Sequence, residues 1–296
     1  AGARYARGTH LITSSIEHPA ILEVCRFMQA HGFAVTILPV DGDGLVSPDD
    51  VAAAIRSDTI MISIMHANNE VGTIQPIREI AAMAREHGIL MHTDAAQSVG
   101  KIATRADDLG VDLLSLAGHK IYAPKGIGAL YIRQGLTPEV FCHGAGQEDG
   151  RRAGTENVLE IVGLGKACEI AEKELDKHRT HMQAMRDRLE AGLAEAPVAV
   201  RFNGHREKRL PNTSSVSFRD LEANRILEEI GLEVAASAGA ACHADQVEIS
   251  HVLKAMQVPE IWAKGTLRFT TGRYTTAAEI DRALEVILAA VKKLQV

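Results

Sequence analysis

The chain carries the stretch SLAGHKIYAPKG at Ser115–Gly126, between the apolar runs Val111–Leu114 and Ile127–Ile132. Apolar runs of this length predict two neighbouring strands joined by a turn. Lys120 sits on that turn, with a glycine before it and Pro-Lys-Gly after it. A lysine that a strand-end turn removes from water loses its proton more readily, and a neutral amine attacks carbonyl groups. Lys120 is therefore either a carbonyl-binding lysine or an ordinary hairpin lysine, and the rest of the chain decides between the two.

Length and composition limit the classes of protein that the chain can represent. It has 296 residues, of which 46% are hydrophobic and 24% charged, as is typical of a globular protein with one large or two smaller domains. The net charge of −6 argues against a nucleic-acid-binding surface, because such a surface is basic. No apolar run reaches the roughly 20 residues of a membrane span. The 4 cysteines form no CxxC pair, which predicts no disulfide framework, no metal site and a cytoplasmic location.

Strand and helix patterns alternate through the first half of the chain. Apolar runs predict strands, and amphipathic segments after Pro19, Ser47 and Pro76 predict helices between them. This alternation indicates an α/β fold with a doubly wound, mainly parallel sheet that helices cover on both faces. Ligands of such sheets bind beyond the carboxyl ends of the strands, so the polar residues there are the candidates for a site. Besides Val111–Leu114, the predicted strands before Lys120 are His10–Thr13, Phe33–Leu38, Thr59–Ile64 and Ile89–Thr93.

The pattern changes in the second half of the chain. Residues 156–193 are helical and charged on one face, which suits a helix that links two domains. Beyond them, strands at Ser214–Phe218 and Gly265–Thr270 with helices around them indicate a smaller α+β domain. We expect a large α/β domain over residues 1–170, including the start of the linking helix, and a small α+β domain over residues 171–296.

Two strand-end residues together suggest a cofactor. Asp94 follows the predicted strand Ile89–Thr93, and Lys120 follows the next strand of the same sheet. Pyridoxal 5′-phosphate needs a lysine that binds its aldehyde and an acid that keeps its ring nitrogen protonated. Asp94 alone is more often explained by a helix cap, but the pair suggests pyridoxal 5′-phosphate.

A resemblance to a known family covers nearly the whole chain. Its stretches are SIEHPAIL (15–22), MHANNEVGTIQPI (65–77), HTDAAQSVGK (92–101), SLAGHKIYAPKGIGALYI (115–132), GQEDGRRAGTEN (146–157), SAGAACH (237–243) and TLRFTTGRYTT (266–276). With these stretches the sequence resembles the cysteine desulfurases of the class V aminotransferase family, which are fold-type I pyridoxal-phosphate enzymes. The resemblance implies that the large domain binds the cofactor and that the small domain carries a cysteine loop. It also implies conversion of L-cysteine to L-alanine, which supplies sulfur for iron–sulfur cluster or related biosynthesis.

The resemblance implies roles for the residues around the cofactor ring. Lys120 holds the cofactor covalently and moves the α-proton of the substrate. Asp94 pairs with the ring nitrogen, and Gln97 hydrogen-bonds the phenolic oxygen. His18 stacks on the ring and assists proton transfer.

Further residues are implied to bind the phosphate and the substrate. His119 binds the phosphate, and Thr155 reaches the phosphate from a partner subunit, so the resemblance implies a homodimer. Asn69 and Arg268 contact the substrate carboxylate, Arg268 through its planar fork, and Asn69 also belongs to the cofactor site.

Cys242 is implied to carry the sulfur. It lies among small residues at 237–245, in a segment interpreted as a loop, and His243 beside it favours the reactive thiolate. The resemblance implies that this thiolate attacks the sulfur of cysteine and then passes a persulfide to an acceptor such as an iron–sulfur scaffold protein. The remaining cysteines lie in helical or apolar surroundings and are expected to be packing residues: Cys25, Cys142 and Cys168.

Two departures from the family pattern affect the phosphate end of the predicted site. Ala117 stands where many members have a serine or threonine, which removes a hydrogen bond worth about 1–3 kcal/mol. Nothing in the chain matches the N-terminal segment of the family, with its phosphate-binding loop. Two alternatives therefore stay open. One is a selenocysteine lyase, which the GAACH motif and Ala117 favour, and the other is a truncated, non-catalytic interaction protein.

Overall fold

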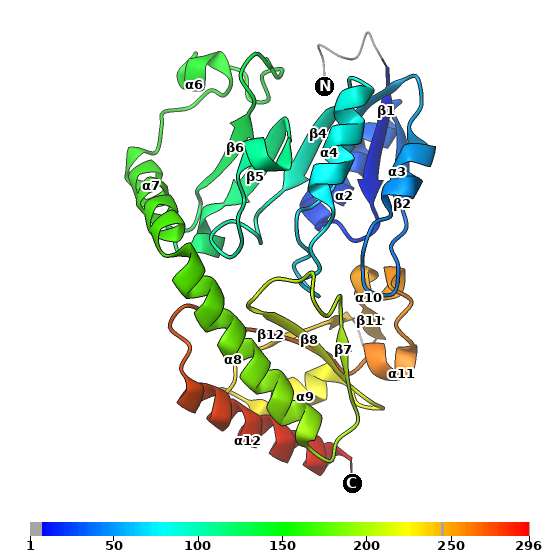
Figure 1. The fold of residues 1–296 in the computed structure, drawn as a ribbon, viewed down its shortest axis with the longest axis vertical. Coiled ribbons are helices and arrows are strands. Elements are labelled where there is room, and N and C mark those ends of the chain that lie inside the picture. Colours follow the sequence, from blue (N-terminus) through cyan, green and yellow to red (C-terminus); the bar gives the residue numbers. More distant parts are fainter. Residues whose placement is uncertain (1–7, 244–245, 296) are drawn as a thin grey trace. The chain divides into compact units, whose positions relative to one another are not determined.

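The computed structural model describes residues 8–243 and 246–295, which form two compact units (Figure 1). Unit 1 comprises Ala1–Leu38, Val46–His66 and Gln75–Leu175. Unit 2 comprises Pro39–Leu45, Ala67–Ile74 and Asp176–Val296. The domain boundary expected at residue 170 stays a prediction.

Unit 1 is built on a sheet whose 6 described strands follow the order β2-β1-β3-β4-β5-β6. The first five strands of the chain run parallel to one another, and β6 pairs antiparallel with β5. The strands are β1 (His10–Ser14), β2 (Ala34–Leu38), β3 (Thr59–Ser63), β4 (Leu90–Asp94), β5 (Leu113–Ala117) and β6 (Gly128–Ile132). The predicted α/β fold with a mainly parallel sheet is therefore confirmed.

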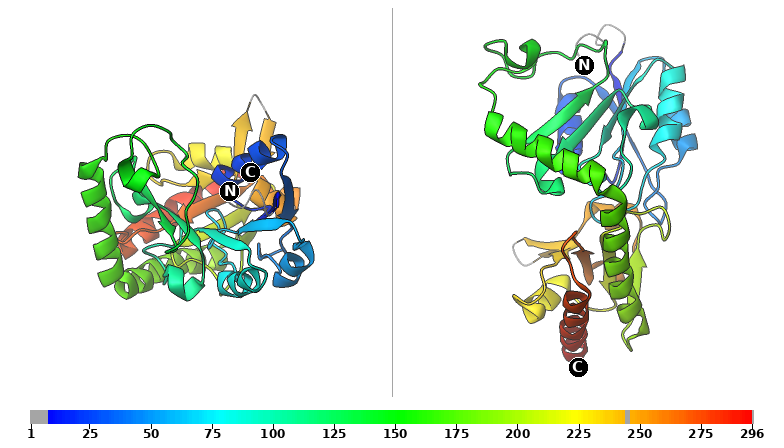
Figure 2. Two further views of the ribbon diagram at one scale, coloured as in Figure 1. Left: turned by 90° about the horizontal axis from the view of Figure 1, so that it is seen from above. Right: turned by 60° about the vertical axis from the view of Figure 1, so that its left-hand side comes forward.

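Helices cover both faces of this sheet, with α2 on one face and α3 and α4 on the other (Figures 1 and 2). The residues that α4 buries recur at helical spacing, which places one apolar stripe against the strands. Pro19 and Pro48 begin α2 and α3, where a missing backbone N–H costs nothing. The helices of unit 1 are α2 (Pro19–Ala30), α3 (Pro48–Ala54), α4 (Ile77–Glu86), α5 (Ala106–Leu109), the 3₁₀ helix η1 (Gly118–Ile121), α6 (Gln147–Gly150) and α7 (Val158–Lys173).

The helical segment predicted over residues 156–193 forms two helices. α7 ends at Lys173 and α8 (Leu175–Glu195) follows it, with Glu174 between them at φ −107° and ψ 12°. These dihedral angles leave the helical region, so the two helices do not share one regular backbone ladder.

Unit 2 is an α+β structure with an antiparallel sheet in the order β7-β8-β12-β9 and a separate β10–β11 hairpin. Helices α8, α9 and α12 contribute Leu193, Ile226 and Ile287 to a core that also contains Phe218 and Leu267 from the sheet. Its strands are β7 (Val200–Asn203), β8 (Thr213–Phe218), β9 (Ser237–Ala238), β10 (Ala240–His243), β11 (Gln246–Ile249) and β12 (Thr266–Thr270). Its further helices are α9 (Ala223–Ile230), α10 (His251–Ala255), α11 (Glu260–Ala263) and α12 (Ala277–Leu294).

Candidate active site

One edge of the unit 1 sheet carries most of the residues predicted for the cofactor. Asp94 is the last residue of β4 and lies opposite Ser115 of the adjacent strand β5. Parallel strands end at a common edge, which is where α/β sheets bind ligands. The residues that lie at or just beyond the strand ends on this edge are His18 after β1, Asp94 and Gln97 after β4, and His119 and Lys120 after β5.

Lys120 lies on η1 and its side chain is exposed, as is that of His119. The next residue, Ile121, is buried and packs with Leu164 and Ala167 of α7, which anchors η1. Gly118 is required where η1 begins, because a Cβ there would lie 2.8 Å from the carbonyl oxygen of Ile127. The expectation that this turn removes Lys120 from water is wrong, since the turn points Ile121 inward and leaves Lys120 accessible.

Asp94 and Gln97 share the tight turn that follows β4. Asp94 Oδ1 accepts a hydrogen bond from the backbone N–H of Ala96 at 2.9 Å. The backbone carbonyl of Gln97 accepts one from Lys101 Nζ at 2.8 Å. The two contacts fix the backbone from which both predicted ring-binding side chains project.

His18 caps the N-terminus of α2. Its backbone is extended, and its Nδ1 accepts a hydrogen bond from the backbone N–H of Ala20 at 3.1 Å. Because Nδ1 accepts, a neutral His18 carries its proton on Nε2. The cap and a ring-binding function are compatible, since the cap uses one ring nitrogen and the side chain is exposed.

A buried histidine stiffens the sheet behind this edge. His92 of β4 hydrogen-bonds Ser63 of β3 through Nδ1 at 2.7 Å and Ser115 of β5 through Nε2 at 2.9 Å. Burial lowers the pKa of His92, so the ring stays neutral and suits both contacts. The strands that precede the candidate residues are thereby linked through side chains as well as backbone.

Two buried ionisable residues of the same region are absent from the sequence prediction. Glu17 is 0% exposed, and burial raises its pKa to about 8 despite hydrogen bonds from Ser14 and Met65. Lys101 is 8% exposed, and burial followed by the charge of Lys120 lowers its pKa to about 8. In the sequence, both residues lie inside stretches that match the family, SIEHPAIL and HTDAAQSVGK. That position does not indicate whether a side chain is buried.

The two residues predicted to bind the substrate carboxylate come together in unit 2. Arg268 lies on β12, and its Nη1 donates to the backbone carbonyl of Asn69 at 2.9 Å. Its Nη2 donates to Ser237 Oγ at 3.0 Å. The segment that carries Asn69 is held in this unit by backbone bonds from Leu210 to Gly72 and from Ile74 to Lys208. The fork of Arg268 is therefore oriented before any ligand arrives.

Cys242 belongs to a strand and not to the loop that the sequence suggested. It lies on β10, opposite Val247 of β11 in an antiparallel hairpin. Its backbone groups are paired in the antiparallel ladder of the hairpin, which an irregular loop would leave unpaired. Residues 244–245 of the predicted loop lie outside the described residues.

The other cysteines divide into two kinds. Burial raises the pKa of Cys25 and of Cys168, which keeps both as unreactive thiols and agrees with a packing role. Cys142 is exposed, so the expectation that it packs is wrong. It lies in the irregular segment between β6 and α6, where its backbone bridges to that of Arg152.

Thr155 does not belong to a strand end of the unit 1 sheet. It is exposed on the segment between α6 and α7, next to Asn157, which caps α7. That position agrees with the expectation that Thr155 acts outside its own subunit, which stays a prediction.

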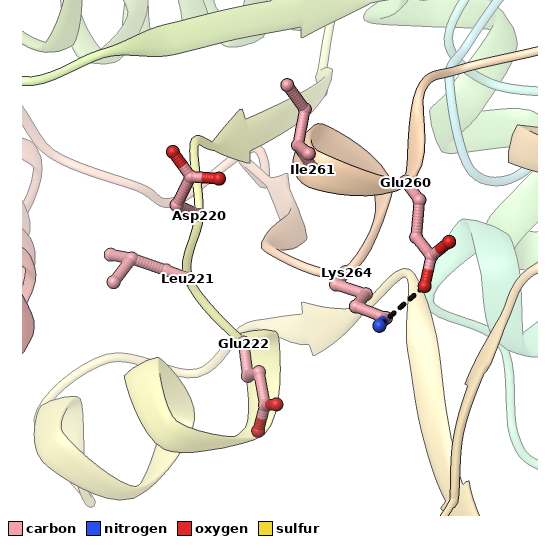
Figure 3. A pocket seen from close by; sticks show the side chains of 6 residues that line it. All are labelled: Asp220, Leu221, Glu222, Glu260, Ile261 and Lys264. Carbon is pink, nitrogen blue, oxygen red and sulfur yellow. Dashed lines mark ion pairs between the residues drawn. The ribbon is translucent and has the colours of Figure 1, made fainter.

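A hollow of about 310 Å³ in unit 2 contains none of the predicted site residues (Figure 3). It is lined by Asp220, Leu221, Glu222, Glu260, Ile261 and Lys264. Figure 3 shows the ion pair between Lys264 and Glu260, which measures 2.5 Å and offsets part of the acidic charge. We therefore assign the candidate site to the strand edge and not to this hollow.

Two features are absent from the described residues, 8–243 and 246–295. Within them no helix combines the length and apolar character that a membrane crossing requires. In the same part of the chain no group of three or more His, Cys, Asp or Glu side chains is arranged to hold a metal ion.

Comparisons with known proteins place this geometry in context. The aminotransferase class-V family matches residues 1–283. The cysteine desulfurase IscS of Dictyoglomus turgidum is 48% identical over 290 residues, which are 98% of this chain and 74% of that protein. A solved NifS-like protein superposes with a TM-score of 0.92 and 36% identity, over 99% of this chain and 78% of its own. A structure described as SspA in complex with cysteine gives a TM-score of 0.77 and 38% identity, over 93% and 78%. These similarities confirm the resemblance and the fold that the sequence predicts.

Proposed function

Because this chain belongs to the aminotransferase class-V family, we propose that it is a pyridoxal-phosphate-dependent cysteine desulfurase. It converts L-cysteine to L-alanine, holds the sulfur as a persulfide on Cys242 and supplies it for iron–sulfur cluster or related biosynthesis. The observation that carries the proposal is the position of Asp94 and Lys120 at the ends of adjacent strands, in a chain whose relative over 98% of its length is named a cysteine desulfurase.

The residues at the strand edge fit pyridoxal 5′-phosphate by their chemistry. Lys120 offers an exposed amine for the aldehyde, and Asp94 offers a carboxylate for the ring nitrogen. The remaining groups are an amide for the phenolic oxygen and an imidazole for the ring face, with further donors for the phosphate. At this edge these groups belong to Gln97, His18 and His119. Asn69 and Thr155, which do not lie at the strand edge, are proposed as further donors to the cofactor. When bound, the cofactor stabilises the electron pair that remains after the α-proton of the amino acid is removed.

Side chains of the protein carry out the proton transfers. Lys120 accepts the α-proton at Nζ and returns it, and its exposure on η1 gives it access to both substrate and cofactor. Asp94 keeps a neighbouring ring nitrogen cationic through its charge. His18 offers Nε2–H, because its other nitrogen is used by the helix cap.

Arg268 and Asn69 orient the substrate. Two terminal nitrogens of Arg268 are already held, by Asn69 and by Ser237. Because the side chain is already oriented, binding a carboxylate costs less conformational entropy. The planar guanidinium also matches the geometry of a planar carboxylate. L-cysteine is the substrate that we propose, and the cysteine complex of the similar SspA supports this choice.

Cys242 receives the sulfur. Its thiolate forms a bond with the substrate sulfur while the carbon–sulfur bond breaks, and the electron pair of that bond remains on carbon, where a proton later adds to give alanine. The reaction leaves a persulfide that passes to an acceptor protein such as an iron–sulfur scaffold. Such chemistry requires a reduced thiol, so we place the protein in the cytoplasm.

A homodimer completes the proposed site. The start of α7 exposes Val158 (65%), Leu159 (84%) and Val162 (65%), and Phe141 nearby in the chain is 96% exposed. Large apolar side chains exposed together mark an interaction surface. The three residues of α7 follow Thr155 closely in sequence, so a second copy bound here brings its own Thr155 into the assembly, as the phosphate-binding role requires.

The test is a titration of the full chain with pyridoxal 5′-phosphate, followed by visible absorbance. We expect a new absorption band in the wild type and in the matched control Lys125→Ala, which removes an exposed lysine from the same turn. Lys120→Ala should lose the band. A wild type without the band, or a Lys120→Ala protein that keeps it, contradicts the proposal.

A further inference from the structure

The hairpin that carries Cys242 is closed at its base by backbone hydrogen bonds. Ser250 directly follows β11, and its N–H donates at 2.9 Å to the carbonyl of Gly239, which directly precedes β10. The N–H of Gly239 in turn donates to the carbonyl of Thr266 on β12 at 2.8 Å. A Cβ on Gly239 would lie only 3.0 Å from Cγ2 of Thr266, so glycine permits this close approach. The base of the hairpin is therefore fixed against the antiparallel sheet of unit 2.

The segment that carries Asn69 is bonded to both sides of this base. On one side, Arg268 donates from Nη1 to the carbonyl of Asn69 at 2.9 Å and from Nη2 to Ser237 Oγ at 3.0 Å. On the other side, Ser250 Oγ donates to Oε2 of Glu70 at 2.5 Å. Ser237 precedes the hairpin in the chain and Ser250 follows it. Two consecutive residues, 69 and 70, therefore hold the two sides, the first through Arg268 and the second directly.

A fully buried asparagine fixes the turn that presents Glu70. Oδ1 of Asn68 accepts hydrogen bonds from the backbone N–H groups of Glu70 at 2.8 Å and Val71 at 3.0 Å. The N–H of Asn68 donates to the carbonyl of Thr73, and its carbonyl accepts from the N–H of Gly72. A side chain that bonds the backbone of its own turn restricts the conformations of that turn. The carboxylate of Glu70 is therefore presented to the hairpin from a fixed backbone.

We propose that Glu70 and Ser250 are positioning residues for Cys242, because their hydrogen bond ties the hairpin to the segment that contacts the substrate carboxylate. A hydrogen bond to a carboxylate is stronger than one between neutral groups, which suits it to this role. With the carboxylate of cysteine held by Arg268 and Asn69, the bond fixes the strand of Cys242 relative to the bound substrate. That consequence rests on the proposed function, whereas the bond and the hairpin exist without a cofactor.

Ser250 also caps a helix, and substitution can separate its two functions. Its Oγ accepts a hydrogen bond from the N–H of Val252 at 3.1 Å at the start of α10. Aspartate is an equally good N-cap, but a carboxylate has no proton to donate. Ser250→Asp therefore keeps the cap, removes the bond to Glu70 and places two like charges together. Addition of Glu70→Gln supplies an amide donor for the new carboxylate, so the double variant restores the bond with donor and acceptor exchanged.

The first measurement is amide hydrogen exchange of the full chain without cofactor, followed in β10 and β11. We expect exchange in these strands to be about tenfold faster in Ser250→Asp than in the wild type, because a hydrogen bond to a charged group is lost. The double variant Ser250→Asp with Glu70→Gln should return most of the way to the wild-type rate. Exchange in β8, in the middle of the sheet of unit 2, should be the same in all three proteins.

Glu248→Gln is the matched control for this measurement. It removes an exposed carboxylate from β11 itself, whose ion pair with Lys254 contributes little stability, so it should exchange like the wild type. Unchanged exchange of β10 and β11 in Ser250→Asp overturns the proposal, and so does a double variant that exchanges as fast as Ser250→Asp alone.

The second measurement is the turnover of cysteine by the cofactor-loaded protein. Ser250→Asp should lower kcat for alanine formation about tenfold and change the KM for cysteine less than about twofold, since Arg268 and Asn69 still bind the carboxylate. The double variant should recover kcat, which a capping role alone does not predict. A kcat that Ser250→Asp leaves unchanged, or that the double variant does not recover, contradicts the positioning role. Absence of turnover in every protein, with the expected exchange, contradicts the proposed function and leaves the bond between Glu70 and Ser250 established.

Discussion

Replacement of Lys101 by methionine is expected to stabilise unit 1. The Lys101 side chain is 8% exposed, and its described hydrogen bond is a single one to the carbonyl of Gln97 at 2.8 Å. An ammonium group has three donors and a strong preference for water. Methionine has nearly the same length and shape and carries no charge, so it removes the desolvation cost and retains the packing.

The magnitude follows from the pKa of the buried amine. That pKa falls from 10.5 to about 8, and one pH unit corresponds to about 1.4 kcal/mol, so the charge at pH 7 costs roughly 3 kcal/mol. Loss of the hydrogen bond to Gln97 destabilises the variant by about 1 kcal/mol. Lys101→Met should therefore raise the free energy of unfolding by about 2 kcal/mol. Between about pH 8 and 10.5 the unfolded chain binds more protons than the folded one, so wild-type stability rises with pH. The advantage of the variant should therefore vanish across that range.

The assay is urea unfolding at pH 7 and near pH 9.5. The readout is amide hydrogen exchange in β4 and β5, because exchange in these strands reports the stability of unit 1 alone. Lys125→Met, which removes an exposed lysine, is the matched control and should change the unfolding free energy little. A Lys101→Met protein that is less stable than the wild type at pH 7 refutes the reasoning, as does a gain that does not depend on pH.

Three further predictions concern unit 2. Glu190→Gln removes the anion that holds Arg209 at 2.7 Å through both terminal nitrogens, and should lower the unfolding free energy by about 3 kcal/mol, measured through the fluorescence of Trp262. Arg268→Lys keeps the charge but loses the planar fork, and should raise the KM for cysteine about tenfold with a smaller effect on kcat; an unchanged KM would contradict its carboxylate role. Thr276→Ala removes the capping box of α12 and should cost about 1 kcal/mol in urea unfolding, whereas Thr276→Ser should cost much less.

The strand-end residues could be predicted from the sequence because apolar runs locate strands and the following residue is then an edge residue. Asp94 and Lys120 were placed in this way, and adjacent parallel strands bring their ends together. The side-chain environment could not be predicted in the same way. Whether Lys120 or its neighbour Ile121 turns inward depends on the contact between η1 and α7, which periodicity does not describe.

The burial of charged residues is the main feature that the sequence patterns do not predict. Glu17 and Lys101 look like ordinary loop residues, since charged side chains are usually exposed. Their burial results from packing between segments far apart in sequence, as the contact of Glu17 with Met65 shows. The bond from Arg268 to Asn69 likewise joins residues 199 positions apart. Sequence patterns within one segment carry no information about such contacts between distant segments.

The most direct test of the proposed desulfurase is to incubate the cofactor-loaded protein with L-cysteine and to measure released alanine together with the sulfur bound to Cys242. The account predicts equal amounts of alanine and Cys242 persulfide in the first turnover. Cys142→Ala, which removes the exposed cysteine, should behave like the wild type. Cys242→Ala should lose both products from cysteine, and selenocysteine cleavage that survives in this variant would identify the lyase chemistry. Continued turnover of cysteine by Cys242→Ala would contradict the account.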